Sequence, residues 1–463
     1  MERLLDIEGL ALESNPVALV LPTLACLFST ITGGRKSYNG YQVLRVNLTT
    51  TRAYNTINGI YLTNTFDFLT PPNRDNPTDL VVCPEQLLPL KGLFTTLRIP
   101  YEVAVPNLEK LIQPQEIEHE TIENNLRRRQ SDGAMNWNAY QKLSTIQNWM
   151  EAQAHDYPQF AQTENYGTST EGRHLKVLKI STGGDGTKPA VWLDGGIHAR
   201  EWISPATVSY IANELIKIAA EGESNENYKL VNSVDWYINP NLNPDGYEYT
   251  QTDRMWRKTR SGNSGFLASA FGCIGTDPNR NWEYQWGGKG TSNNPCSQIY
   301  RGTSAASEPE VKLTQDYVYA RREQIKLFLT FHAYSQMIFT PWGYDDVPID
   351  DKEELMLVAR NAAKALQSVH NTEFQSGSSP ELLYAAAGGS EDFAKGKAGI
   401  KFAYCYELRD TGKYGFILPP DQIIPSGEET FAAVKSMVGD VMAYYRVPEF
   451  EQSEQIIQDL RLK

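Results

Sequence analysis

The strongest constraint on the fold is an alternation of apolar β-type runs with amphipathic helices, which extends from about residue 137 to residue 445. A helix is expected to begin at Ser204 and Pro205, where a capping residue precedes a first-turn proline. Further helices are expected at 355–369 and 431–445. Buried strands are expected at 190–193, 234–238, 325–331 and 400–406. Such an alternation predicts an α/β domain.

A shorter pattern precedes this domain, between residues 41 and 114. Pro84 opens a helix as a first-turn proline, and strands are expected at 42–47, 80–83 and 101–105. Strands and helices that alternate over so short a span predict a small α+β sandwich of the ferredoxin-like kind. The segment contains no histidine and only one cysteine, so we expect no catalytic role for it.

Composition limits the classes of partner. The chain has 463 residues and a formal net charge of -13, with 41% hydrophobic and 21% charged residues. An acidic protein repels phosphate backbones, so a nucleic acid is not expected as a partner. No apolar run reaches the length of a membrane span, so no membrane partner is expected either. The length suggests two or three domains.

The N-terminal 35 residues resemble a secretory leader in one respect. The apolar run at 17–28 has the length of a signal-peptide core, and small residues follow it. The stretch before the run is long and acidic, whereas such leaders begin with a short basic region. The alternatives are a secretory signal, a buried helix or an incorrectly assigned start.

A strongly polar connector at 116–132 separates the two patterns and holds Arg127, Arg128 and Arg129. Three arginines can form the solvated end of a helix. Exposed connectors between domains are also where proteolytic nicking concentrates, so the alternative is a cleavable linker. The chain is therefore expected to divide into a leader, a small domain, a polar linker, a large α/β domain and a polar tail, at residues 1–35, 36–115, 116–132, 133–447 and 448–463.

Two of the five cysteines lie in one loop rich in Gly, Ser and Asn. Cys273 and Cys296 are 23 residues apart, and a disulfide between them would stabilise the loop by roughly 3 kcal/mol. A disulfide implies an oxidising compartment. The alternative is two free thiols. Cys405 lies in an apolar strand and is expected to be a buried thiol.

Histidines mark a candidate metal site. The chain has only six of them. His198 and Glu201 follow the strand expected at 190–193, and His332 follows the strand expected at 325–331. Ligand sites in open α/β sheets form at the carboxyl ends of strands, and two His with one Glu form a catalytic zinc set. Any one His taken alone is more often a buried, hydrogen-bonded core residue.

Charged groups near these histidines add catalytic candidates. Asp277, Asn279 and Arg280 share one loop, Arg257 lies in a second basic cluster, and Glu407 follows another expected strand. A carboxylate near zinc is a candidate general base, and an arginine there is a candidate oxyanion stabiliser. The alternative for each charged residue, taken singly, is a structural salt bridge.

Taken together, these motifs resemble the zinc metallocarboxypeptidases of the pancreatic A/B type, which are made as procarboxypeptidases. The matching strings occur in the family's order, and the resemblance covers about residues 137–445. The N-terminal module and the three arginines resemble the family's activation segment and cleavage site. The strings are GGIHAREW (195–202), NPDGY (243–247), RMWRKTR (254–260), NRNW (279–282), HAYSQ (332–336) and ELRDTGKYGF (407–416).

The resemblance implies a catalytic machinery built on Zn²⁺. His198, Glu201 and His332 would bind the metal, and Asp277 would orient His198. Glu407 would act with the zinc to activate a water for attack on the last peptide bond. One zinc ion per catalytic domain is expected.

The resemblance also implies how a C-terminal residue is selected. Arg257 would stabilise the oxyanion, while Asn279, Arg280 and Tyr384 would hold the free carboxylate of the substrate. A planar guanidinium binds a carboxylate bidentately, and the interior of a chain offers no such group. Arg200 matches a residue that contacts the substrate further along the cleft.

Further implications concern the fold and its partners. Tyr334 falls among the substrate-binding positions, and Cys273 with Cys296 matches the family's disulfide. The fold would be an eight-stranded mixed sheet flanked by helices. The expected protein is a secreted, monomeric zymogen that is activated by a trypsin-like protease and acts on peptides with a free C-terminus. One departure is Ala333, where the family commonly has Ser.

Glu391 falls at the position that sets the terminal-residue preference of the family, which is apolar in the A type and Asp in the B type. A carboxylate there favours Lys or Arg by charge pairing, and Gly343 and Ser379 would leave room for a long side chain. The sequence therefore predicts a basic preference. The alternative is that Glu391 pairs with a neighbour such as Lys395 and leaves the pocket effectively apolar.

Three rival classes remain. A non-catalytic relative would lack a ligand or the base, whereas this chain keeps both. A processing carboxypeptidase, active without a pro-segment, would carry a C-terminal β-sandwich, whereas the extra domain here is N-terminal. Residues 41–114 could also form a permanent binding domain, in which case the uncleaved protein would be active.

Overall fold

The computed structural model describes residues 31–32, 34–74, 76–115, 135–184, 186–262 and 272–450. The leader expected up to residue 30, the three arginines at 127–129 and the tail from 451 lie outside these ranges. The chain divides into two compact units, Met1–Gln113 and Pro114–Lys463. Within the ranges described, we find no helix with the length and apolar character needed to cross a membrane.

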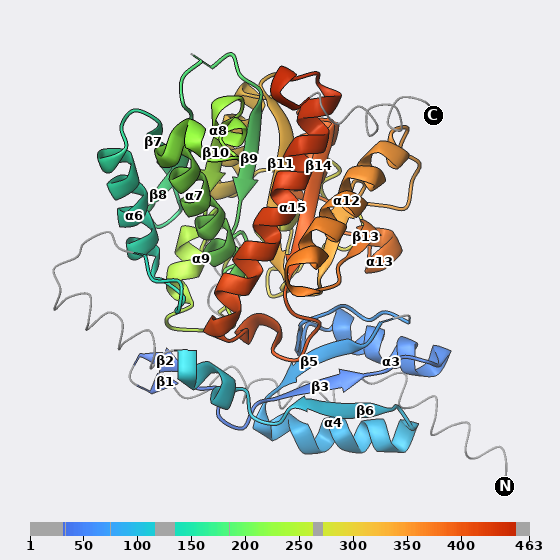
Figure 1. Ribbon diagram of the computed structural model, residues 1–463. Helices are drawn as coiled ribbons and strands as arrows, with labels where there is room; N and C mark the ends of the chain where they lie inside the picture. Colours follow the sequence, from blue (N-terminus) through green and yellow to red (C-terminus); the bar gives the residue numbers. More distant parts are fainter. Residues whose placement is uncertain are drawn as a thin grey trace, which may run out of the picture. The chain divides into compact units, whose positions relative to one another are not determined.

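The first unit is a four-stranded antiparallel sheet with two main helices, drawn in blue in Figure 1. Its order along the chain is β3 (Gln42–Val46), α3 (Thr51–Leu62), β4 (Asp67–Phe68), β5 (Thr78–Val82), α4 (Pro84–Leu97) and β6 (Tyr101–Val105). The strand order is β4-β5-β3-β6. This βαββαβ arrangement confirms the expected ferredoxin-like module. A short pair, β1 (Ile31–Thr32) and β2 (Arg35–Lys36), precedes it.

One apolar core holds this unit together. Leu44, Leu80 and Val82 of the sheet pack with Phe94 of α4 and Ile57 of α3, and all five are buried. The sequence accounts for both helix starts. The Thr50 hydroxyl accepts from the backbone N–H of Ala53 at the start of α3, and Pro84 is the first residue of α4.

The second unit contains the predicted eight-stranded mixed sheet. Its strand order is β13-β12-β14-β11-β9-β10-β8-β7. Strands β10, β9, β11 and β14 run parallel, as do β12 and β13, whereas the β7–β8, β8–β10 and β12–β14 pairs are antiparallel. The strands are β7 (Ala161–Thr168), β8 (His174–Ile180), β9 (Ala190–Asp194), β10 (Asp235–Asn239), β11 (Ile325–Ala333), β12 (Met337–Thr340), β13 (Gln375–Ser378) and β14 (Phe402–Leu408).

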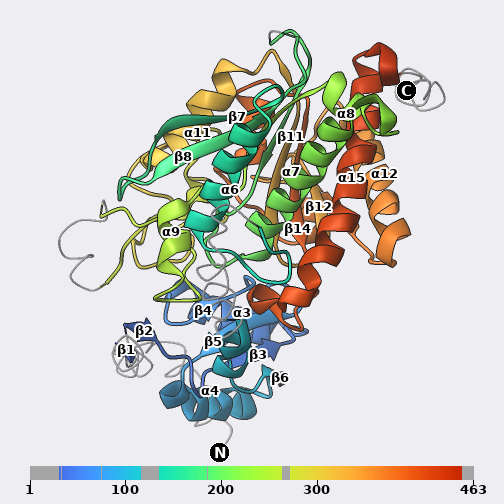
Figure 2. The same cartoon turned by 60° about the vertical axis from the view of Figure 1, so that its left-hand side comes forward.

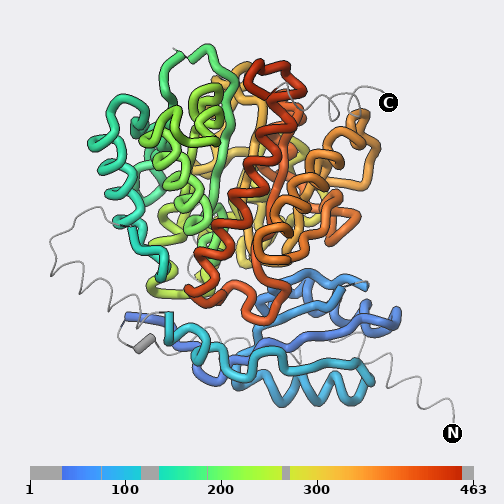
Figure 3. The backbone as a smooth tube through the Cα atoms, in the orientation of Figure 1, coloured from blue at the N-terminus to red at the C-terminus, as the bar shows by residue number. Residues whose placement is uncertain are grey.

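Helices cover this sheet on both faces. In Figure 1, α7 (Ile203–Glu221), α12 (Lys352–His370) and α15 (Ile423–Tyr444) lie across the near face. Figure 2 shows α11 (Pro309–Ala320) beyond the strands, and Figure 3 traces the backbone of each unit. Val311 and Val318 of α11 and Phe393 of α14 (Ser390–Gly396) share one core with Trp192 of β9 and Phe328 of β11.

Further helices of this unit are α6 (Leu143–Asp156), α8 (Lys229–Asn232), α9 (Pro244–Tyr249) and α13 (Ser379–Leu382).

Two helix starts differ from the sequence prediction. The cap of α7 is Trp202 rather than Ser204, because the Ser204 hydroxyl accepts from the Gly196 N–H at 2.8 Å and donates to the Phe331 carbonyl at 2.6 Å. That hydroxyl therefore ties the turn after β9 to β11 instead of capping the helix. Helix α15 begins at Ile423, eight residues before the predicted start at 431.

The parallel centre of the sheet brings the candidate site together. Strand β11 includes His332, and β14 includes Glu407, which lies directly opposite His332 in the register. Strand β9 ends at Asp194, just before the turn that carries His198. Because parallel strands end at the same edge of a sheet, these three segments converge there.

Candidate active site

Three buried side chains form one metal-binding group. Single ligand atoms of His198, Glu201 and His332 all lie within 4.8 Å of one another. His198 Nδ1 is 2.9 Å from Glu201 Oε1 and 3.0 Å from His332 Nδ1, and His332 Nδ1 is 3.3 Å from Glu201 Oε2. The turn after β9 supplies the first two residues and β11 supplies the third.

These three residues fit a zinc ion. Ligands about 2.0–2.1 Å from a tetrahedral metal are separated from each other by roughly 3.3 Å, close to the spacings found here. In this buried site two imidazole nitrogens and a carboxylate oxygen face one another. A shared cation is the partner that satisfies all three. Two His and one Glu are the donors of a catalytic zinc site, which leaves one coordination position for water or substrate.

Asp277 supports the group from behind. Its Oδ1 lies 3.0 Å from His198 Nε2, so that when Nε2 donates to it the other ring nitrogen faces the metal position. Its Oδ2 accepts from Arg257 at 2.9 Å through Nη2 and at 3.2 Å through Nε. Burial opposes ionisation of Asp277, but Arg257, Arg280 and His198 outweigh it and hold its pKa well below the usual range. One carboxylate thus connects the ligand His198 to Arg257.

The half-buried Glu407 lies beside this group. Removal from water raises its pKa to about 8, a shift that His332 opposes and Glu201 reinforces. Burial opposes the charged form of Glu201 as well, but His198 and His332 lower its pKa strongly. Burial alone would lower the pKa of His332, yet the hydrogen bond to Glu201 and the surrounding carboxylates raise it. A bound divalent cation would favour the ionised form of both carboxylates.

The expected carboxylate-binding residues are held by their own contacts. Arg280 is buried, and its guanidinium donates to the carbonyls of Gly290 and Asn279, both at 2.9 Å. The side-chain oxygen of Asn279 accepts from the Ser390 N–H at 3.0 Å. Tyr384 follows α13 and is half-buried, with its backbone carbonyl accepting from the Ser379 hydroxyl at 2.7 Å.

Arg200 and Tyr334, the other expected substrate contacts, meet at one aromatic ring. The Arg200 guanidinium lies 4.2 Å from the centroid of Phe416. The Tyr334 ring packs edge-on against the same ring, with centroids 5.1 Å apart. Phe416 ends a string noted in the sequence but was not singled out as a site residue, because only the fold shows that it joins the other two.

Glu391 occupies a confined position in the first turn of α14. It is 6% exposed, and its Oε2 has no hydrogen-bond partner among the described residues. A Cβ on Gly343 would lie 2.7 Å from Oε1, and one on Gly389 would lie 2.8 Å from Oε2. The two glycines therefore make room for the carboxylate. Burial raises the pKa of Glu391 above its ordinary value.

Lys395 does not pair with Glu391. Lys395 donates to Asp351 at 2.8 Å and to the Lys401 carbonyl at 3.0 Å, so the alternative in which it pairs with Glu391 is wrong. The adjacent Asp392 accepts from the backbone N–H groups of Gly343 at 2.9 Å and Tyr344 at 2.8 Å. Asp392 thus fixes the segment that faces Glu391.

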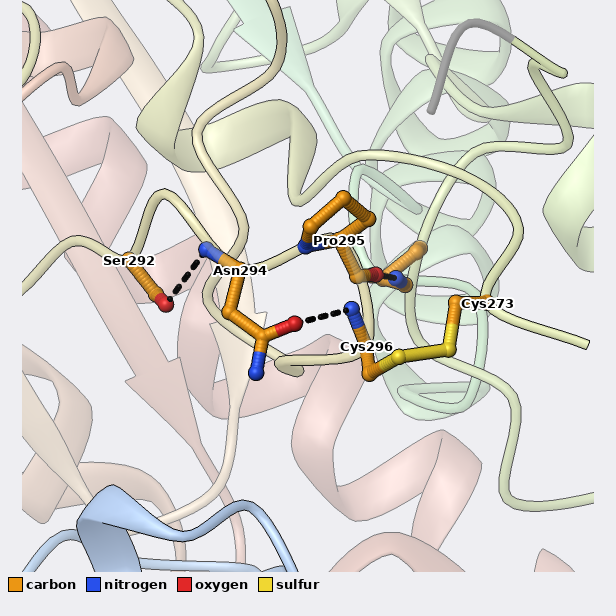
Figure 4. The surroundings of a disulfide bond; sticks show 6 residues. Cys273, Ser292, Asn294, Pro295 and Cys296 are labelled. Atoms are coloured by element: carbon orange, nitrogen blue, oxygen red, sulfur yellow. Dashed lines mark hydrogen bonds between the residues drawn. A yellow bond between two sulfur atoms is a disulfide. The ribbon is translucent and has the colours of Figure 1, made fainter. Parts of the chain in front are cut away.

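The predicted disulfide is present. Cys273 and Cys296 are bonded, with their Cα atoms 4.5 Å apart, which excludes the alternative of two free thiols (Figure 4). Asn294 Oδ1 accepts from the Cys296 N–H at 3.0 Å, and the Pro295 carbonyl accepts from Lys258 Nζ at 2.8 Å. Cys405 is a free, buried thiol, as expected.

Comparison with known proteins agrees with this site. The zinc carboxypeptidase family matches residues 146–433, and the carboxypeptidase activation peptide family matches residues 44–115. Carboxypeptidase B of Astacus astacus is 48% identical over 67% of this chain and 100% of its own length. Carboxypeptidase A4 of Mus musculus is 39% identical over 88% of this chain and 95% of its own. The crystal structure of thrombin activatable fibrinolysis inhibitor (TAFI) is 35% identical, with a TM-score of 0.77, over 86% of this chain and 98% of that one.

The sheet and its buried His–Glu–His group define a zinc hydrolase. The chain belongs to the zinc carboxypeptidase family and is a procarboxypeptidase of the A/B type, with an activation peptide ahead of the catalytic domain. Its cofactor is zinc, its substrates are peptides, and it is a zymogen that is activated by proteolysis.

Proposed function

We propose that this chain is a secreted zymogen whose mature form removes single residues from the C-termini of peptides and proteins and prefers Lys or Arg. Glu391 carries the substrate preference. Its carboxylate is buried, one oxygen lacks a partner within the described structure, and Lys395 is engaged elsewhere. Arg280 and His332 favour the charged form of Glu391, but a buried carboxylate without a directly bonded cation is unfavourable, and the side chain of a C-terminal Lys or Arg would supply one.

In the proposed reaction, each residue has one task. When bound, zinc supplies a Lewis acid that polarises the scissile carbonyl and acidifies water. Glu407 takes the proton of the attacking water and returns it to the leaving amine. Arg257 faces the oxygen of the scissile carbonyl and stabilises the negative charge that develops there. Asp277 holds both His198 and Arg257 in place.

Selection of the chain end rests on a second set of residues. Asn279, Arg280 and Tyr384 bind the terminal carboxylate of the substrate, since a guanidinium and neighbouring polar groups match its two oxygens. Arg200 and Tyr334 contact residues upstream of the scissile bond. A peptide interior has no carboxylate for the first set to bind, which restricts the enzyme to the C-terminus.

Activation and localisation complete the proposal. A trypsin-like protease cleaves at Arg127, Arg128 or Arg129, within the linker at 116–132, and separates the activation domain at 36–115 from the catalytic domain at 133–447. The leader at 1–35 directs secretion, in agreement with the disulfide between Cys273 and Cys296, a bond typical of oxidising compartments. The mature enzyme acts as a monomer.

The test measures release of the C-terminal residue from matched peptides ending in Arg, Lys, Leu, Phe or Glu. Full-length protein is assayed before and after limited trypsin, with and without a zinc chelator. We expect chelator-sensitive release that appears only after trypsin and is fastest for Arg or Lys. Faster release of Leu or Phe refutes the basic preference, and full activity without cleavage refutes the zymogen.

A matched variant tests the pocket itself. Glu391→Gln keeps the shape of the side chain and removes its charge. A hydrogen bond to a charged group contributes roughly 1.5–3 kcal/mol, so kcat/KM for Arg-terminated peptides should fall by about 10- to 100-fold. Release of Leu should be unchanged or faster. An equal loss for Arg and Leu would show that Glu391 is structural.

A further inference from the structure

We propose that Asn243 is a positioning residue of this enzyme, whose side-chain amide fixes the loop of two metal ligands against the loop that carries Arg257. The inference rests on the proposed role of Arg257. It concerns the NPDGY string at 243–247, to which neither the metal site nor substrate binding assigns a task.

The amide of Asn243 bridges the two loops. Asn243 is fully buried, and its Nδ2 donates to the carbonyl of Ile197 at 3.2 Å and to the carbonyl of Lys258 at 3.1 Å. Ile197 directly precedes His198, and Lys258 directly follows Arg257. Both hydrogens of one amide are therefore used to join the backbone beside a metal ligand to the backbone beside the proposed oxyanion residue.

Other bonds define what Asn243 adds. The Ala199 N–H donates to the Arg257 carbonyl at 3.1 Å, and Arg254 Nη1 donates to the Arg200 carbonyl at 2.8 Å, so the two loops also meet through these two bonds. Trp256 Nε1 donates to the Lys258 carbonyl at 2.7 Å, but Trp256 belongs to the same loop as Arg257. Asn243 comes from neither loop, so it ties both of them to a third segment at the start of α9.

The rest of the string holds Asn243 in place. Its Oδ1 accepts from the Gly246 N–H at 2.9 Å and caps α9. A Cβ on Gly246 would lie 2.5 Å from Asn243 Nδ2 and 2.6 Å from the Lys258 carbonyl, so only glycine fits there. Asp245 accepts from the Ser169 hydroxyl at 2.6 Å and anchors the segment to another part of the unit.

A second contact, made by the side chain of Lys258, also holds the loop that carries Arg257. Lys258 Nζ donates to the Pro295 carbonyl, next to the Cys273–Cys296 disulfide (Figure 4). Lys258, the residue after Arg257, is thus held at its backbone carbonyl by Asn243 and at its side chain by the loop that the disulfide closes. Misplacement of a catalytic group by about 1 Å lowers the rate about 100-fold, so the loss of Asn243 should act mainly on the chemical step.

Asn243→Ser is the main test, because serine can still cap α9 but is too short to reach both carbonyls. In the trypsin-activated, zinc-loaded enzyme, kcat should fall about 10- to 100-fold while KM changes less than about threefold. Gly246→Ala, which displaces the amide by steric contact, should reproduce this pattern. Asn239→Ser is the matched control, since Asn239 is equally buried but its Nδ2 donates to Tyr166; its kcat should stay within about twofold.

A double-variant cycle with Arg257→Gln separates positioning from general damage. If Asn243 acts through Arg257, Asn243→Ser should lower kcat by less than about threefold in the Arg257→Gln background. An equal loss in both backgrounds, or an unchanged kcat in Asn243→Ser, overturns the inference.

Two further results keep the inference and the proposed function distinguishable. If Arg257→Gln alone leaves kcat unchanged, the proposed role of Arg257 fails, whatever Asn243→Ser does. If Asn243→Ser does not fold, Asn243→Gly places a tolerated residue at the cap of α9 and lacks both donors, and it should show the same selective loss of kcat. Retention of kcat by Asn243→Gly also overturns the inference.

Discussion

Glu310, in the first turn of α11, gives a stability prediction with a definite sign. The side chain is fully buried. Its Oε1 accepts from the Thr170 N–H at 3.0 Å, and its Oε2 has no partner in the described part of the chain. Its pKa is raised from 4.5 to about 7, mainly by burial. The nearby carboxylates Glu308 and Asp245 add to the rise, and backbone hydrogen bonds oppose it.

The folded protein therefore holds the Glu310 proton more tightly than the unfolded chain does. The contribution of Glu310 to the free energy of unfolding is complete below the pKa of the unfolded chain, about 4.5. It is lost as the pH rises through the folded pKa of about 7. Each pKa unit corresponds to about 1.4 kcal/mol, which sets an upper bound of roughly 3 kcal/mol on the cost of ionisation above that window. Glutamine mimics the protonated form and never incurs this cost.

Glu310→Gln should consequently stabilise the protein at pH 8 by roughly 1–3 kcal/mol and change its stability little at pH 5. Urea unfolding of the zinc-loaded protein at pH 5, 6, 7 and 8 measures the difference between variant and parent. Glu323→Gln is the control, since the Glu323 side chain is 91% exposed, and it should show no such pH dependence. A difference that is the same at every pH, or a variant less stable than the parent at pH 8, refutes the reasoning.

The metal site, the disulfide and the specificity pocket give three further predictions. Glu201→Gln should lose zinc during dialysis, measured as metal content, whereas Asp277→Asn should weaken zinc binding only about 10- to 100-fold; full zinc retention by both would contradict the ligand assignment. Replacement of both Cys273 and Cys296 by Ser should lower the free energy of unfolding by about 3 kcal/mol in urea titrations, and an unchanged midpoint would show that the staple is dispensable. Because burial raises the pKa of Glu391, the Arg-over-Leu ratio of kcat/KM should fall as the pH is lowered through that pKa, and a ratio that stays constant over the whole pH range in which the protein is folded would contradict a charged pocket.

The centre of the sheet was predictable from sequence, and its edges were not. Strands β9, β11 and β14 are buried on both faces and therefore appear as continuous apolar runs. The edge strand β13 has the sequence QSGS, and the opposite edge strand β7 is mostly polar. Edge strands need only one partner and one covered face, so their sequences carry little periodic pattern.

The candidate site also has a part that the sequence predicted and a part that it did not. The ligands follow expected strands, and the resemblance to known carboxypeptidases supplied the other roles. The contribution of Phe416 depends on packing against Arg200 and Tyr334, which periodicity does not report. Asn243 was visible within a matching string, but its contacts lie 46 and 15 residues away along the chain.

Taken together, these contacts make Arg257 the point on which several supports converge. Asp277 holds its guanidinium, Ala199 binds its carbonyl, and Asn243 and the disulfide loop fix the residue that follows it. Asp277 also contacts His198, so its loss should disturb zinc binding and the oxyanion contact together. Asn243 acts only on the backbone, where neither zinc nor substrate can compensate. A variant with a lower kcat and a normal zinc content therefore has lost a contact that fixes the backbone, such as those of Asn243. A variant that loses kcat and zinc together has lost the contacts of Asp277.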